Sequence, residues 1–226
     1  MNSVANQSSQ AANNAPAKAH QPESVFMTEE EYLKSELTSE VKREYIDGQV
    51  YAMAGAGYNH NCLSTNVARE FGNHLKGSPC ATFVTEMKVR LGKNYVYPDV
   101  LVDCNKMAGD DYFSTSPIII VEVLSKSTRK MDTTEKLIRY INLPSLQEYV
   151  LIEQQIVSVQ VLRRSNHWKP EYFYLGDQVT FESIGLTLPV EEIYDRVDNE
   201  DMHEFIQQKQ LAEQNNSVNQ DALVDS

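Results

Sequence analysis

Two apolar segments that each carry one carboxylate decide the fold of this chain: residues 97–102, YPDVLV, and residues 118–124, IIIVEVL. Both are short runs of β-branched and aliphatic residues bounded by Gly, Pro or Ser, which predicts two buried strands. Burying Asp99 and Glu122 in such strands is costly unless each carboxylate is paired, protonated or bound to a metal. The presence of two such carboxylates therefore favours a cation between them.

The composition is that of a globular protein with no membrane partner. Hydrophobic residues make up 41% and charged residues 23% of the 226 positions, which are ordinary values for a globular fold. No apolar stretch approaches the roughly 18 residues that span a bilayer, and the first 24 residues lack the apolar core of a secretory signal. Cys62, Cys80 and Cys104 form no CxxC pair, which favours reduced thiols and a cytoplasmic location.

The polar composition of both ends predicts one domain between two tails. Residues 1–24 are rich in Ala, Asn, Gln and Ser and are expected to be disordered. The domain is expected over residues 25–197, and a polar acidic tail over residues 198–226. The formal net charge is −12, of which −5 falls on residues 200–226, whereas residues 122–139 carry +2. Such a basic rim on an acidic body can approach a phosphate backbone weakly and with strong salt dependence.

Capping and turn signals divide the domain into an alternation of helices and strands. Thr28 and Glu31 have capping-box spacing ahead of a short helix. Asp47-Gly48 between two short apolar runs predicts a hairpin, and Asn59 is expected to cap the next helix. This order predicts an α/β fold with a mixed sheet and helices packed on its faces. The other expected elements are apolar helix positions Leu63, Val67, Phe71 and Leu75, a helix over 125–142, and strands over 148–152, 156–162 and 168–175.

Asp99 and Glu122 are the candidate metal ligands, and a lysine is the candidate partner. Mg²⁺ or Mn²⁺ takes oxygen ligands from one or two carboxylates and keeps several waters. Such an ion polarises a phosphodiester and lowers the pKa of a bound water, and a lysine then orients that water or neutralises developing charge. In many metal nucleases the lysine lies two residues after the glutamate, but that position is Leu124 here. Lys126 and Lys136 therefore both stay open.

Lys136 lies one turn after Asp132 on the helix that is expected to follow the Glu122 strand. A helix packed over that strand would lower the ammonium group towards the carboxylates, whereas an exposed lysine would only pair with Asp132 along the helix. Glu44, just before the hairpin turn, is a further candidate, with an ordinary strand-end carboxylate as the alternative. His60 is a weaker candidate at the start of the first long helix.

These residues form an ordered series that resembles the Uma-two family of the restriction-endonuclease-like, PD-(D/E)xK superfamily. The resemblance covers roughly residues 27–195 and implies a restriction-endonuclease-like mixed β-sheet flanked by α-helices. It also implies Asp99 and Glu122 as metal ligands, with the active lysine moved onto the following helix at Lys136. The chain departs from the family pattern at Lys126, where proline is usual, and at Glu153, where aspartate is usual. The residues that carry the resemblance are Glu44 with 45–48 (YIDG), His60, 98–100 (PDV), 121–125 (VEVLS), Thr128, Asp132, Lys136, Tyr140 and 148–149 (EY).

We therefore expect a metal-dependent endonuclease that hydrolyses phosphodiester bonds of nucleic acid, DNA ahead of RNA. Asp99, Glu122, Lys136 and Glu44 are the expected catalytic residues, and Mg²⁺ or Mn²⁺ is the expected cofactor. One alternative is a non-catalytic module that binds nucleic acid or protein on the same fold. Another is a structural homodimer joined through the C-terminal tail. Affinity for Mg²⁺ or Mn²⁺ distinguishes the enzyme from both.

Overall fold

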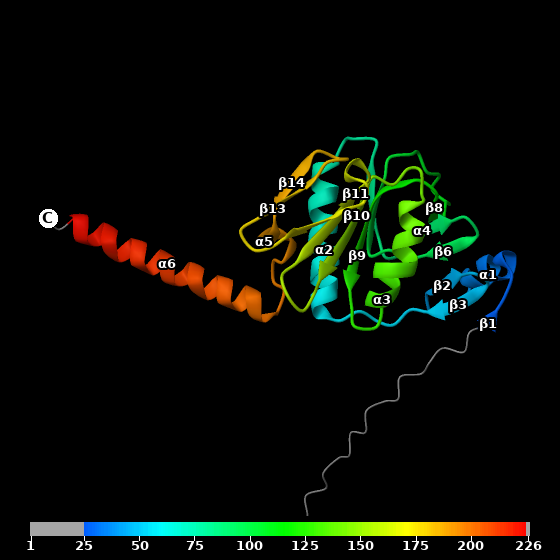
Figure 1. The fold of residues 1–226 in the computed structure, drawn as a ribbon, viewed down its shortest axis with the longest axis horizontal. Helices are drawn as coiled ribbons and strands as arrows, with labels where there is room; N and C mark the ends of the chain where they lie inside the picture. The colour runs from blue at the N-terminus through cyan, green and yellow to red at the C-terminus, as the bar shows by residue number, and fades with distance from the viewer. Residues whose placement is uncertain (1–24, 225–226) are drawn as a thin grey trace, which may run out of the picture.

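The computed structural model describes residues 25–224, so the tail expected over residues 1–24 lies outside the described part. Two six-stranded sheets and one β-hairpin make up the β-structure (Figure 1). The first sheet has the order β1-β3-β2-β6-β5-β8, with strands Val25–Phe26, Gln49–Ala52, Arg43–Ile46, Asn94–Val96, Lys88–Leu91 and Phe113–Ser114. The second has the order β12-β11-β10-β9-β7-β4, with strands Pro170–Phe173, Val159–Arg163, Glu148–Glu153, Pro117–Leu124, Val100–Asp103 and Ala81–Val84.

The Asp-Gly hairpin and the capping box form as the sequence predicts. Thr28 caps α1 (Glu29–Glu36), and its side chain and that of Glu31 bond to each other's backbone. β2 and β3 pair antiparallel. Asp47 and Gly48 between them have φ angles of 52° and 84°, the left-handed pair that a tight two-residue hairpin needs.

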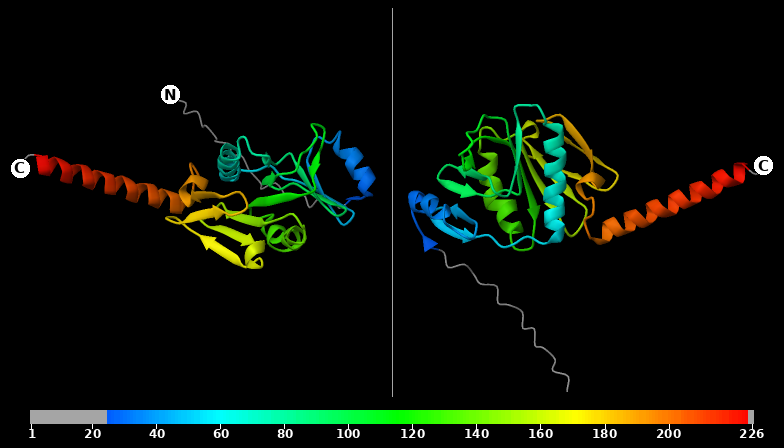
Figure 2. Two further views of the ribbon diagram at one scale, coloured as in Figure 1. Left: turned by 90° about the horizontal axis from the view of Figure 1, so that it is seen from above. Right: turned by 180° about the vertical axis from the view of Figure 1, so that it is seen from behind.

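The second sheet is covered by helices on both faces (Figure 2). On one face α2 (Tyr58–His74) buries Leu63, Val67 and Phe71 against alternate residues of β7 and β9. On the other face lies one helical segment made of α3 (Arg129–Met131), the π-helical turn η1 (Asp132–Lys136) and α4 (Leu137–Ile141). In β9 the chain alternates between the two cores, with Val121 and Val123 towards α2 and Ile120 and Leu124 towards α4. The remaining elements are η2 (Arg164–Asn166), the hairpin of β13 (Gln178–Phe181) and β14 (Leu186–Pro189), α5 (Val190–Ile193) and α6 (Glu200–Val224).

Asn59 does not cap α2, contrary to the sequence prediction. The N-cap is Gly57, which has no side chain to bond the helix end. The Asn59 side chain instead donates to the Asp198 carbonyl at 2.7 Å and accepts from the Asp198 amide at 2.9 Å. This tertiary contact ties the start of α2 to the segment just before α6 and outweighs the local capping preference.

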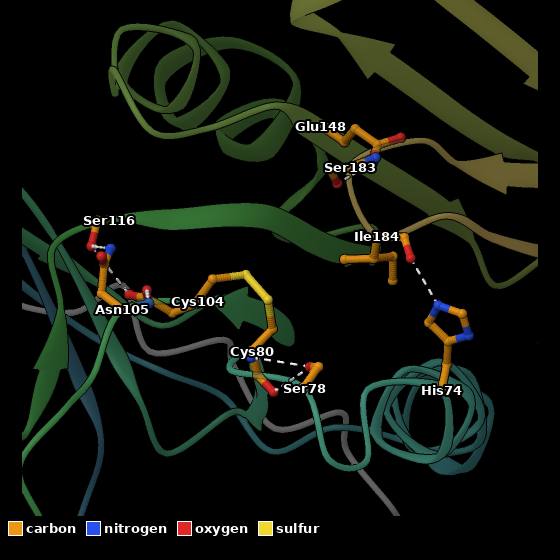
Figure 3. The surroundings of a disulfide bond; sticks show 10 residues. His74, Ser78, Cys80, Cys104, Asn105, Ser116, Glu148, Ser183 and Ile184 are labelled. Atoms are coloured by element: carbon orange, nitrogen blue, oxygen red, sulfur yellow. Dashed lines mark hydrogen bonds between the residues drawn. A yellow bond between two sulfur atoms is a disulfide. The ribbon is translucent and has the colours of Figure 1, made fainter.

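A disulfide joins Cys80 and Cys104, so the expectation of three reduced cysteines is wrong (Figure 3). β4 and β7 are antiparallel with Ala81 opposite Asp103, and the next position outward therefore brings the two cysteines together. Only Cys62 is free in the described part of the chain. The pairing depends on the strand register, which cysteine spacing in the sequence does not show.

The segment expected as an acidic tail is largely the helix α6, which projects away from the domain (Figure 1). Its first two turns contact the body: Met202 is buried and Phe205 packs against the α2 side of the sheet. Across residues 25–224, every helix is too short or too polar to cross a membrane.

Candidate functional site

Asp99 and Glu122 lie next to each other on the same face of the second sheet. Val100 of β7 pairs with Val121 of β9, so one step further along the antiparallel pair Asp99 comes opposite Glu122. Opposite residues of such a pair share a face, here the face covered by α4. The Val123 amide donates to Asp99 Oδ2 at 2.7 Å, which ties the first carboxylate to the strand that carries the second.

Lys136 projects from the helical segment into this face and contacts three carboxylates. Its Nζ lies 2.8 Å from Glu44 Oε1, 3.3 Å from Glu122 Oε1 and 3.4 Å from Asp132 Oδ1. All four side chains are buried, with no more than 8% of any side chain exposed. The π-helical turn that presents Asp132 and Lys136 is a rare local structure that often occurs at functional sites.

Glu44 joins the cluster from the other sheet. Its Oε1 accepts a hydrogen bond from the Tyr97 amide at 3.0 Å as well as the contact from Lys136. Tyr97 directly precedes the Pro98-Asp99 step, so one carboxylate bonds both to the lysine and to the backbone leading into Asp99. The cluster therefore forms where the two sheets meet.

Burial and mutual repulsion shift the protonation of the cluster. Burial is the largest influence on Glu122 and raises its pKa well above the ordinary value of 4.5; Lys136 opposes this shift. The charges of Asp132, Asp99 and Glu44 raise that pKa further. Burial would lower the pKa of Lys136, but the three carboxylates together outweigh it and hold that pKa well above its ordinary value. Lys136 is therefore an ammonium at neutral pH, and Glu122 keeps a proton more readily than an ordinary glutamate does.

Three further residues touch this cluster: Tyr140 and Asp132, which were not predicted as site residues, and His60, which was the weaker candidate. Tyr140 donates its hydroxyl to Glu122 Oε1 at 2.9 Å. Burial raises the pKa of Asp132, and its Oδ1 makes no hydrogen bond within residues 25–224 although it lies near Lys136. His60 Nε2 lies 3.3 Å from Asp99 Oδ2. Burial alone would lower the pKa of His60, but the Asp99 carboxylate outweighs it and raises that pKa. The four-residue spacing of Asp132, Lys136 and Tyr140 was the available signal.

The structure places Lys126 outside the cluster and leaves most cations of the expected basic rim paired or buried. Lys126 is exposed and forms no ion pair within the described residues. Arg129 pairs with Glu153, and Arg139 pairs with Asp47 at 2.5 Å. Since Lys136 is buried as well, the rim expected over residues 122–139 retains few cations free to meet a phosphate backbone.

The free oxygens of the two strand carboxylates suit a hard divalent ion. Asp99 Oδ1 and Glu122 Oε2 accept no hydrogen bond from any residue in the described part of the chain. No cluster of three or more His, Cys, Asp or Glu side chains in that part is arranged to hold a metal. Two carboxylates completed by water are a usual Mg²⁺ environment, so the donor set fits such an ion.

The fold and this cluster define a restriction-endonuclease-like protein, with a mixed sheet between helices and two strand carboxylates facing a helix lysine. Residues 29–191 match the family described as "Uma2: Putative restriction endonuclease", and the chain belongs to that family. Two relatives from Synechocystis sp. (strain PCC 6803) are named as uncharacterized proteins. The protein slr1290 is 35% identical over 183 residues, which cover 78% of this chain and 96% of the relative. The protein sll1609 is 35% identical over 134 residues, which cover 57% of this chain and 76% of the relative.

A solved structure has the same fold. It is described as a "putative nuclease belonging to DUF820" from Anabaena variabilis ATCC 29413. It superposes with a TM-score of 0.62 at 21% sequence identity and covers 74% of this chain and 97% of that one. At this identity the likeness concerns the architecture.

Proposed function

We propose that the protein is a divalent-metal-dependent endonuclease that hydrolyses phosphodiester bonds, with DNA as the substrate. The observation that carries the proposal is the contact of buried Lys136 with Glu122, beside Asp99 on one sheet face. Membership of the Uma2 family supports the reaction class. A buried lysine held by three carboxylates is costly for stability alone, which favours a role in chemistry.

In this proposal Asp99 and Glu122 would hold Mg²⁺. The bound ion would polarise the phosphodiester and make a bound water more acidic. Because the pKa of Lys136 is raised, its ammonium stabilises negative charge on the phosphate and does not deprotonate the water. Glu44 holds the ammonium in place at 2.8 Å, and its contact with the Tyr97 amide fixes Glu44 in turn.

Nicking of a supercoiled plasmid in the presence of Mg²⁺ tests the proposal. Asp99→Asn and Lys136→Ala should each reduce the rate by about a hundredfold or more, the usual cost of removing one group that stabilises transition-state charge. Lys126→Ala is the matched control and should cleave like wild type, because Lys126 is exposed and outside the cluster. Calorimetric titration of Mn²⁺ should show a site in wild type that Asp99→Asn loses and Lys136→Ala keeps.

Two outcomes would contradict the proposal. Equal Mn²⁺ binding by wild type and Asp99→Asn would remove Asp99 from the ligand set. A protein that binds duplex DNA but never nicks it with Mg²⁺ or Mn²⁺ would be the non-catalytic binding module instead.

A further inference from the structure

A cavity of about 1150 Å³ lies away from the carboxylate cluster, between α1 and the first sheet. None of Glu44, Asp99, Glu122 and Lys136 lines it. Its volume slightly exceeds the usual range for small-molecule sites, about 300–1,000 Å³, so a nucleotide-sized ligand would fit. Its walls combine apolar and aromatic side chains with three lysines and three glutamates. The lining residues are Thr28, Glu29, Glu30, Leu33, Lys34, Glu36, Leu37, Tyr45, Lys88, Lys93, Tyr112 and Phe113.

Lys88 is the unusual residue of this cavity, because it is buried without a carboxylate partner. Only 7% of the residue is exposed, and no Asp or Glu within residues 25–224 forms an ion pair with it. Its Nζ donates to the Tyr97 hydroxyl at 3.2 Å and lies 5.2 Å from the centre of that ring. Burial lowers the pKa of Lys88, against the opposing charges of Glu36 and Glu86. A buried ammonium with one neutral partner retains donors for an anion.

The glutamates of the cavity wall do not form an ion pair with the Lys88 ammonium. Glu36 Oε1 pairs with Arg43 at 2.7 Å, and Glu36 Oε2 accepts the Tyr97 hydroxyl at 3.0 Å. Glu29 Oε1 pairs with Arg90 at 3.0 Å. With both arginines counted, the walls and their ion-pair partners carry two more cations than anions. Lys88 therefore has no ion-pair partner among the wall glutamates, and the cavity suits an anionic ligand.

The aromatic side chains of the cavity indicate that the anionic ligand also carries a flat ring. Phe113 is half-buried in the wall, and Tyr112 beside it is 61% exposed, so much of the Tyr112 ring surface is open to a bound ligand. Phosphate next to lysine and a base stacked on an aromatic ring are the two contacts by which proteins hold nucleotides without reading sequence.

We propose that this cavity is a binding site for a 5′-phosphorylated nucleotide, with the phosphate on Lys88 and the base against Tyr112 and Phe113. The choice of a nucleotide rests on the proposed nuclease function, whereas the anionic, ring-bearing character of the ligand rests on the cavity alone. Tyr97 connects the site to the carboxylate cluster, since its hydroxyl contacts Lys88 and its amide bonds Glu44.

Calorimetry with thymidine 5′-monophosphate and full-length protein in EDTA tests the site. Wild type should bind the nucleotide, and Lys88→Met should weaken binding by about tenfold or more, the effect of losing a charge-assisted hydrogen bond. Lys76→Met, which changes an exposed lysine on another part of the surface, should bind like wild type. Tyr112→Ala should also weaken binding, and because Tyr112 is exposed this variant should fold like wild type. Thymidine without phosphate should bind at least about tenfold more weakly than the monophosphate.

Asp99→Asn separates this proposal from the catalytic one, because it should lose cleavage and keep nucleotide binding. The bound nucleotide could be the end of a nucleic-acid strand or a free nucleotide. Binding of a short single strand with a 5′-phosphate, compared with its 5′-hydroxyl form, distinguishes these two sources. Preference for the phosphorylated strand over the mononucleotide identifies a subsite for substrate ends, and the reverse identifies a free nucleotide. Failure of wild type to bind the mononucleotide, equal binding by Lys88→Met, or loss of binding in Asp99→Asn would overturn the separate site.

Discussion

The environment of Glu122 opposes its ionised form. This residue lies in β9 between Val121 and Val123, is 3% exposed, and faces three other carboxylates and one ammonium. A raised pKa means that the folded protein retains a proton that the unfolded chain loses near pH 4.5. The stability linked to that proton is fully present below about pH 4.5 and is lost as pH rises through the raised pKa.

Glu122→Gln should therefore stabilise the metal-free protein at neutral pH. Gln keeps the shape and the Tyr140 contact but needs no proton, and Lys136 keeps Glu44 and Asp132 as partners. We expect the melting temperature at pH 7 in EDTA to rise by about 3 °C or more, which corresponds to ~1 kcal/mol in a domain of this size. The gap to wild type should close as pH falls towards 4.5. An equal or lower melting temperature at pH 7 would show that Glu122 is ionised and well compensated.

Asp132 is a positioning residue in our proposal, since it contacts Lys136 and not the reacting atoms. Its carboxylate helps to hold the pKa of Lys136 above the ordinary value. Asp132→Asn should therefore lower that pKa, and the fall of plasmid nicking at high pH should begin at a lower pH than in wild type. Asp132→Glu should restore the wild-type profile. If Asp132→Asn only lowers the rate equally at every pH, its role is structural.

Local sequence signals predicted those elements whose interactions lie within a few residues. The Asp47-Gly48 turn and the Thr28 cap depend on neighbours in the chain, and both form as expected. The pairing of Cys80 with Cys104 depends on the register of β4 against β7, which only the folded sheet determines.

The candidate site was predictable in part for the same reason. Two carboxylates in apolar runs identified Asp99 and Glu122 as unusual, and the family resemblance indicated Lys136. The depth of Lys136, the proximity of Glu44 and the buried Asp132 result from packing a helix and a second sheet on β9. The spacing of residues in the sequence does not predict how these elements pack together.

The disulfide should stabilise the β4–β7 strand pair, whose opposite end lies near the candidate site. β4 and β7 are joined at Cys80 and Cys104, while Asp99 lies just before the other end of β7. The crosslink spans 24 residues, and closing a loop of that length contributes about 3 kcal/mol through the unfolded state. Replacing both cysteines by alanine should lower the free energy of unfolding by about that amount in urea denaturation. Cys62→Ala is the control and should change it little; equal curves for wild type and the double variant would mean that the bond is absent in solution.

The charge of the whole molecule opposes its proposed substrate, and α6 carries much of the excess. The chain has a net charge of −12, and residues 200–226 account for −5. The helix projects from the folded body (Figure 2), although Glu200, Asp201 and Glu204 lie in its first turns beside that body. Because Met202 is buried and Phe205 packs against the core, deleting all of α6 would also disturb packing.

A variant that removes charge and keeps the docked turns tests whether α6 repels nucleic acid. Deleting residues 207–226 and changing exposed Glu200 and Glu204 to Gln removes −4 of the −5 while retaining Met202 and Phe205. This variant should bind a short duplex more tightly than wild type at low salt, with Ca²⁺ in place of Mg²⁺ to limit cleavage. The difference should shrink towards about 0.15 M salt, where charges more than about 8 Å apart are largely screened. Fluorescence anisotropy at two salt concentrations measures both effects, and a melting curve checks that the variant is folded. Equal affinities at low salt would show that the α6 charge does not affect binding, and a difference that persists at high salt would indicate a direct contact between α6 and the duplex site.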